Sequence, residues 1–204
     1  MKKTAAFLFS LGLAAGTYYA VIFPAGIKEF LWYCNIALFV SAVGFWRQDS
    51  RLISAVLLTA VPSQFFWIIA NIMNASGGPA MGRSQWLPQQ IGYPGFIIEV
   101  LYHFTLIPVC AFGVWKYGYD RRAARWATLI FLPMLVLTRL AAKPWENNIN
   151  CMFFPCDMKY SQELAEAFGT PYALRRIAGF MVICGVLHLI AIRLLPDANF
   201  KPKP

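Results

Sequence analysis

The sequence predicts an all-α protein that crosses a membrane several times as a bundle of about six helices. Hydrophobic residues make up 59% of the 204 residues, charged residues make up only 13%, and the mean hydropathy is +0.54. Soluble domains carry about 25% charged and about 45–50% apolar residues. The apolar surface of this chain therefore exceeds the core that a domain of its size can form, and much of it must face lipid.

Six apolar segments are long enough, or nearly long enough, to cross the hydrocarbon core of a bilayer, which takes about 20 helical residues. Each segment is apolar nearly all round, unlike a surface helix with one apolar stripe. Trp46, Trp115, Tyr117 and Trp126 lie near segment ends, as interfacial anchors do. We expect one transmembrane domain over residues 1–204, without an evident internal repeat. The predicted spans are residues 5–27, 30–46, 52–73, 96–115, 126–142 and 177–195, of which the second and fifth are short.

The first segment has two interpretations. Lys2 and Lys3 precede an apolar run, and the small residues Ala14 and Gly16 resemble the cleavage region of a signal peptide. The run continues to Ile27, which favours an uncleaved first helix over cleavage after residue 16. Both interpretations give the same topology for the rest of the chain.

The distribution of basic residues predicts the orientation. The formal net charge is +9, but the basic residues form short clusters between apolar segments, which excludes a nucleic-acid-binding stripe. With both termini in the cytoplasm, eleven Lys and Arg residues lie on that side: Lys2, Lys3, Arg47, Arg51, Lys116, Arg121, Arg122, Arg125, Arg193, Lys201 and Lys203. Six lie on the other side: Lys28, Arg83, Lys143, Lys159, Arg175 and Arg176. This excess predicts that both termini lie in the cytoplasm.

The cysteines and histidines give no sign of a metal site. The chain has five cysteines, no Cys-x-x-Cys pair and two histidines, so we expect neither a structural zinc site nor another cofactor. Cys151 and Cys156 lie in a predicted outer loop. Their spacing is compatible with a disulfide that closes a small loop and equally with two free thiols, because sequence does not give the Cα separation.

Ionisable residues inside the predicted spans are the candidates for function, because a charge in the bilayer is costly. Glu99 and His103 are four residues apart and share a helix face, where a carboxylate can orient an imidazole that acts as a base. The predicted topology places Asn35 and Arg139 at similar depth, in the outer half of the bundle. We therefore expect His103 and Glu99 to be catalytic and Asn35 and Arg139 to bind substrate. His188 has no acidic neighbour on its helix, which favours a structural role.

Several of these residues also have a purely structural interpretation. Glu99 and Arg139 lie near enough to the interface to reach water, or they form a structural ion pair. Asn35 can serve only to join two helices. The loop that follows Arg139 is rich in hydrogen-bonding groups. We expect its Glu146, Asn147 and Asn150 to bind substrate as part of a lid over the site, with a tightly bonded loop as the alternative.

Four pieces of the chain together resemble a family of small bacterial six-helix membrane proteins: Trp32–Asn35, Tyr102–Pro108, Gly118–Ala123 and Glu146–Asn150. More distantly, the layout is similar to the androgen-induced membrane hydrolases, which cleave fatty acid esters of hydroxy fatty acids, and to the YwaF-like proteins. The resemblance implies that His103 stands at the place of the hydrolases' catalytic histidine. Their catalytic threonine is replaced by Trp32, and Cys34 lies on a different helical face from it.

Two functions follow as expectations. The first is an intramembrane hydrolase or acyl-transfer enzyme that acts on a lipid or another apolar substrate, with His103 as base and with water or an unidentified group as nucleophile. The second is a non-catalytic membrane protein, either a partner subunit or a carrier of lipids or small solutes. Membrane lipids are the expected partners in both cases, with a membrane protein as partner in the second.

Overall fold

The computed structural model describes residues 1–23, 26–76, 87–142, 150 and 162–198, and the elements in these ranges are helices. Lipid offers no partner for backbone polar groups, so an apolar chain satisfies them within its own helices. The elements are α1 (Lys2–Ile22), the 3₁₀ helix η1 (Gly26–Leu31), α2 (Tyr33–Arg47), α3 (Ser50–Ala75), α4 (Leu87–Tyr117), α5 (Ala123–Ala141) and α6 (Gln162–Leu194).

Five helices in the described part of the chain are long and apolar enough to cross a membrane: α1, α3, α4, α5 and α6. This confirms the predicted all-helical class for the described residues and supports a transmembrane protein, whereas six spans stay a prediction. The predicted span over residues 30–46 is the exception. It forms the 15-residue helix α2, which is about 22 Å long and therefore shorter than a hydrocarbon core of about 30 Å.

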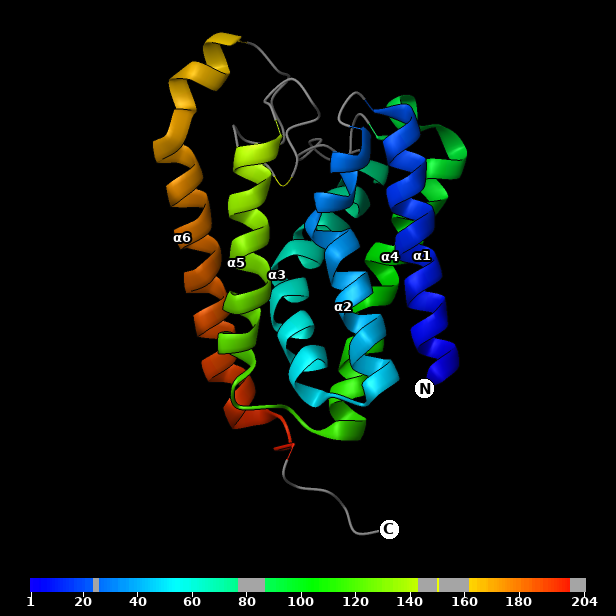
Figure 1. Ribbon diagram of the computed structural model, residues 1–204, viewed down its shortest axis with the longest axis vertical. Helices are drawn as coiled ribbons and strands as arrows, with labels where there is room; N and C mark the ends of the chain where they lie inside the picture. Colours follow the sequence, from blue (N-terminus) through cyan, green and yellow to red (C-terminus); the bar gives the residue numbers. More distant parts are fainter. Residues whose placement is uncertain (24–25, 77–86, 143–149, 151–161, 199–204) are drawn as a thin grey trace.

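The helices run up and down in turn, so that the start of α1 and the end of α6 lie at the same end of the bundle (Figure 1). The α2–α3 and α4–α5 connections lie at this end too, which we call the inner end because it carries most of the basic residues. Helix α3 is central and packs against α2, α4, α5 and α6. Close approach of α1 to its neighbours depends on small residues: a Cβ at Gly16 would lie 2.3 Å from the Phe30 ring.

Two of these helices, α4 and α6, contain the same Gly-x-Pro break near their N-terminal ends. In α4 the chain breaks at Gly92 (φ 62°) before Pro94, and in α6 it breaks at Gly169 (φ 47°) before Pro171. Glycine adopts positive φ without steric cost, and proline suits the first turn of a helix because it has no N–H to leave unpaired. Each continuous helix begins just after its Gly-x-Pro break, which lies a few residues before the predicted spans at residues 96–115 and 177–195.

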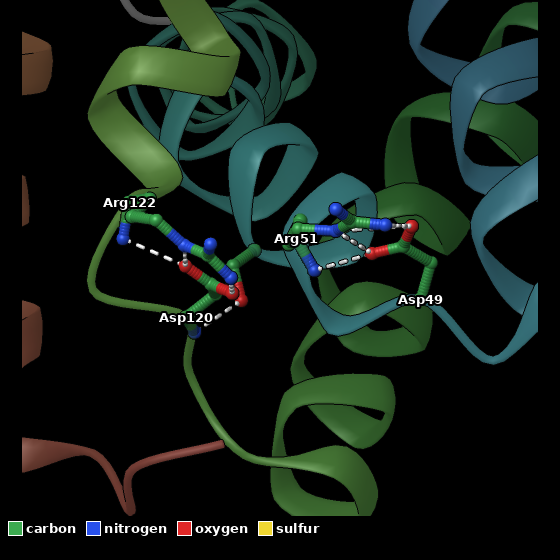
Figure 2. A network of polar contacts seen from close by, with 5 residues as sticks. Asp49, Arg51, Asp120 and Arg122 are labelled. Carbon is green, nitrogen blue, oxygen red and sulfur yellow. Dashed lines mark hydrogen bonds and ion pairs between the residues drawn. The ribbon is translucent and has the colours of Figure 1, made fainter. Parts of the chain in front are cut away.

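The two inner connections share an Asp-x-Arg clamp (Figure 2). Asp49 accepts hydrogen bonds from the backbone N–H of Arg51 at 2.9 Å and from its guanidinium at 2.7–3.2 Å. Asp120 does the same for Arg122, and its own N–H donates to Ser54 Oγ on α3 at 3.0 Å. Each aspartate thus fixes the chain where the next helix begins. The same Asp-x-Arg pattern thus occurs in both connections, although they differ in length.

We expect Asp49→Asn to lower stability slightly at neutral pH and to make the protein less sensitive to acid. Hydrogen bonds from the Arg51 side chain hold the pKa of Asp49 below its ordinary value. Such a carboxyl adds stability above its unfolded pKa of about 3.9, and this stability is lost as the pH falls through the lower, folded pKa. The effect is small because the pair is partly exposed. Thermal unfolding in detergent should show a difference between wild type and variant at pH 7 that shrinks at pH 3. An equal difference at both values would contradict this account.

Candidate functional site

The structure brings His103 and Glu99 together on the inward face of α4, where both are buried. His103 Nδ1 lies 2.9 Å from the Glu99 carbonyl oxygen and 3.3 Å from Oε2 of the Glu99 carboxylate. Both of these oxygens act as acceptors, so Nδ1 must carry the ring proton and donate a hydrogen bond. The other ring nitrogen, Nε2, is then left as an acceptor, which is the form of imidazole that acts as a base.

The carboxylate of Glu99 is itself held by α1. The buried Tyr19 hydroxyl donates a hydrogen bond to Glu99 Oε1. From the sequence we expected Arg139 as the partner of Glu99. Arg139 lies in the last turn of α5 with its side chain half-buried, and its pairing with Glu99 stays a prediction. Tyr19 was missed because a tyrosine near the end of an apolar run is usually an interface anchor.

The free nitrogen of His103 faces a thiol. Cys34 Sγ of α2 lies 3.6 Å from His103 Nε2. On its other side, the Gln64 amide of α3 donates to the same sulfur at 3.1 Å. Gln64 is fully buried, and its Oε1 has no hydrogen-bond partner among the described residues. Three helices therefore place a thiol between an imidazole and an amide.

Aromatic rings fix the orientation of the imidazole. The Trp67 ring of α3 stacks on His103 with the two ring centroids 3.8 Å apart and the planes inclined by 12°. The Tyr102 ring lies 4.2 Å from the His103 ring, centroid to centroid. Stacking of this kind restricts rotation of the ring about its side-chain bonds and removes water from its face. The base is therefore held in one orientation relative to the thiol.

Asn35 is also buried, but its amide is directed toward η1. Asn35 Nδ2 donates to the backbone oxygen of Glu29 at 3.0 Å, and Glu29 Oε2 accepts a hydrogen bond from Trp32 Nε1 at 2.7 Å. Asn35 Oδ1 has no hydrogen-bond partner in the part of the chain that the structure describes. Adjacent residues of a helix point about 100° apart. The side chain of Cys34 therefore faces His103, while that of Asn35 points toward η1.

Asn150 caps a helix from a distant part of the chain. The side chain of Trp32, the N-cap residue of α2, makes no capping hydrogen bond to this helix. Asn150 Oδ1 instead accepts a hydrogen bond from the first N–H of α2, that of Tyr33, at 2.7 Å. Asn150 Nδ2 donates to the Leu31 oxygen at 2.7 Å and to Thr138 Oγ1 of α5 at 3.1 Å. The expected substrate-binding residue is thus part of a tightly bonded junction between η1, α2 and α5.

Other predicted residues fall outside this site. Glu146, Asn147, Cys151 and Cys156 lie outside the described residues. His188 lies near the end of α6, where its Nδ1 pairs with the Tyr119 hydroxyl at 2.9 Å and not with Cys34 or His103. In the ranges that the structure describes, no three His, Cys, Asp or Glu side chains are grouped so that they could hold a metal ion.

No protein-family model, no curated protein and no solved structure matches this chain.

Proposed function

We propose that this protein is an intramembrane hydrolase or acyl-transfer enzyme that acts on a lipid or another apolar ester, with His103 as general base and Glu99 as the residue that orients it. One observation carries the proposal: Glu99 accepts a hydrogen bond from Nδ1–H of a buried imidazole whose Nε2 faces a thiol. A base must present an unprotonated nitrogen within reach of the proton that it removes. A histidine that only fills space in the core does not require a carboxylate on one ring nitrogen and a thiol beside the other.

The surroundings of the site support an apolar substrate. On the other face of α4, the side chains of Ile97, Leu101 and Phe104 are about half exposed. In a bilayer these residues contact acyl chains, so a lipid ester can approach the bundle within the membrane. The resemblance of Tyr102–Pro108 to the catalytic segment of the androgen-induced membrane hydrolases adds support for ester cleavage.

We also propose that the chain has six spans, with both termini in the cytoplasm of a bacterial inner membrane. Helix α2 would complete its crossing together with η1, since residues 26–47 form an almost continuous helical segment. Lys2, Arg47, Lys116 and Arg193 lie at or next to helix ends. Because the helix directions alternate, these ends lie at the same end of the bundle, which is consistent with the positive-inside rule (Figure 1).

Reporter fusions test this topology. Fusions after Arg51 and Arg122 should behave as cytoplasmic, because both positions lie in or next to the basic inner connections. Fusions at positions 78 and 161 should behave as external. Alkaline phosphatase and green fluorescent protein fused at each position give opposite signals for the two sides. The reverse pattern at all four positions would contradict the N-in, C-in arrangement.

Lipidomics tests the proposed function in cells. A strain that lacks the gene is complemented with wild type, with His103→Gln or with His188→Gln. We expect an ester-containing lipid to accumulate in the deletion strain, to return to normal with wild type and with His188→Gln, and to stay high with His103→Gln. Identical lipid profiles in all four strains would contradict the proposal.

A non-catalytic lipid-binding protein is the second candidate, and a separate crevice favours it. This crevice, of about 160 Å³, lies between α3, α5 and α6 and is lined almost entirely by apolar atoms, with Ala124, Ala127, Phe180 and Gly185 among its residues. Such a crevice can hold part of an acyl chain without any chemistry. Under this alternative the His103→Gln strain would have the lipid profile of wild type.

A further inference from the structure

We infer that Cys34 is the nucleophile of the site and that its sulfur is acylated by a carboxylic ester during the reaction. The inference rests on the proposed function and supplies the group that the sequence did not identify. Cys34 Sγ lies 3.6 Å from the only ring nitrogen of His103 that can accept its proton. Nucleophile, base and orienting carboxylate thus follow one another as Cys34, His103 and Glu99, the arrangement that activates a thiol for attack.

Gln64 gives independent support for a reactive thiol. A glutamine amide buried within a bundle of apolar helices is costly unless both of its ends are bonded. Gln64 Nε2 donates to Cys34 Sγ, yet Oε1 is left without a hydrogen-bond partner among the described residues. An N–H directed at the sulfur stabilises the negative charge that forms there when the proton leaves.

The other two described cysteines serve as comparisons within the same chain. Cys110 Sγ lies 3.4 Å from the Ser41 hydroxyl, and Cys184 Sγ donates weakly to the Leu58 carbonyl oxygen at 3.9 Å. Both are buried, whereas Cys34 is partly exposed. Of the three thiols, Cys34 alone has an imidazole and an amide beside its sulfur.

The reaction would proceed in two steps. His103 Nε2 removes the proton of Cys34, the sulfur attacks the ester carbonyl carbon, and the carbonyl electron pair moves onto oxygen. As this intermediate collapses, the bond to the ester oxygen breaks, and the leaving alcohol takes the proton from His103 Nε2. In the second step water, or a second alcohol, gives its proton to His103 and attacks the thioester. The carbon–sulfur bond breaks, the thiolate recovers the proton, and a carboxylic acid or a new ester leaves.

Two measurements on the full-length protein in lipid nanodiscs test the inference. The first is the rate at which iodoacetamide alkylates each cysteine, followed by mass spectrometry of the resulting peptides. We expect alkylation of Cys34 to be at least about 10-fold slower in His103→Gln than in wild type, because the base that removes its proton is gone. The rates at Cys110 and Cys184 should stay within about 2-fold and so show that the variant is folded. An unchanged rate at Cys34 would overturn the inference.

The second measurement uses p-nitrophenyl octanoate as substrate. In wild type we expect release of p-nitrophenol and an octanoyl group on Cys34 that hydroxylamine removes, as it does from thioesters. Cys34→Ala and Cys34→Ser should each lose at least about 100-fold in rate, while Cys110→Ala and Cys184→Ala keep wild-type rates. Full activity in Cys34→Ala with loss in His103→Gln would overturn the inference and leave the proposed function standing. Full activity in His103→Gln would overturn both.

Discussion

Replacing His103 by glutamine should slow ester hydrolysis by about 100- to 10 000-fold, the usual contribution of a positioned general base. Glutamine has a similar length and polarity, so the packing against Trp67 changes little. It cannot accept the proton of Cys34 and pass it to a leaving group. The rate constant should fall much more than the apparent affinity for substrate, because the lost interaction belongs to the transition state. Turnover of p-nitrophenyl octanoate in nanodiscs measures both quantities.

His188→Gln is the matched control for this experiment. It changes the other histidine of the chain, which pairs with Tyr119 near the inner end. We expect its hydrolysis rate to stay within about 2-fold of wild type. Equal rates for His103→Gln and His188→Gln would show that His103 has no part in the chemistry.

Replacing Asn150 by alanine should give the largest loss of stability among the single changes considered. The change removes the cap of Tyr33 N–H and the bonds to Leu31 and Thr138. Hydrogen bonds between helices in membrane proteins contribute about 0.6–2 kcal/mol each, so the loss of three should total about 2–6 kcal/mol. The backbone of Asn150 also has positive φ (57°), where alanine is strained. Thermal unfolding in detergent, followed by circular dichroism, measures the effect.

Two further variants separate the causes of this loss. Asn150→Gly loses the same hydrogen bonds but tolerates the positive φ, so it should be more stable than Asn150→Ala by about 1 kcal/mol. Asn71→Ala removes one bond to the backbone of its own helix and should have little effect. If Asn150 instead binds substrate, as the sequence first indicated, Asn150→Ala would raise KM and leave the melting temperature unchanged.

The class of the fold could be predicted from composition because lipid leaves few alternatives. An apolar chain must bond its backbone internally, so long apolar segments become helices at nearly the predicted places. The residues at which the helices begin and end were less predictable. The breaks at Gly92 and Gly169 depend on the backbone angles of single residues, and the short helix α2 shares its end of the bundle with η1.

The site was only half predictable, for a related reason. Counting residues from the ends of a span gives the depth of a side chain, and this placed Glu99 and His103 in the outer half of the bundle. It does not give the direction in which a side chain points when a helix is apolar all round, because no stripe marks the inward face. Cys34 and Asn35 have nearly the same depth, yet only Cys34 contacts His103. Tyr19 and Gln64 were missed because their partners come from other helices.

The protonation of the His103 ring is the most direct test of the account. The chain has only two histidines, so ¹⁵N-histidine labelling of wild type and of His188→Gln in lipid bilayers assigns the signals of His103 by solid-state nuclear magnetic resonance. The account predicts a protonated Nδ1 that donates to Glu99 and an unprotonated Nε2 that faces Cys34. A proton on Nε2 would leave the site without a base and would contradict the account.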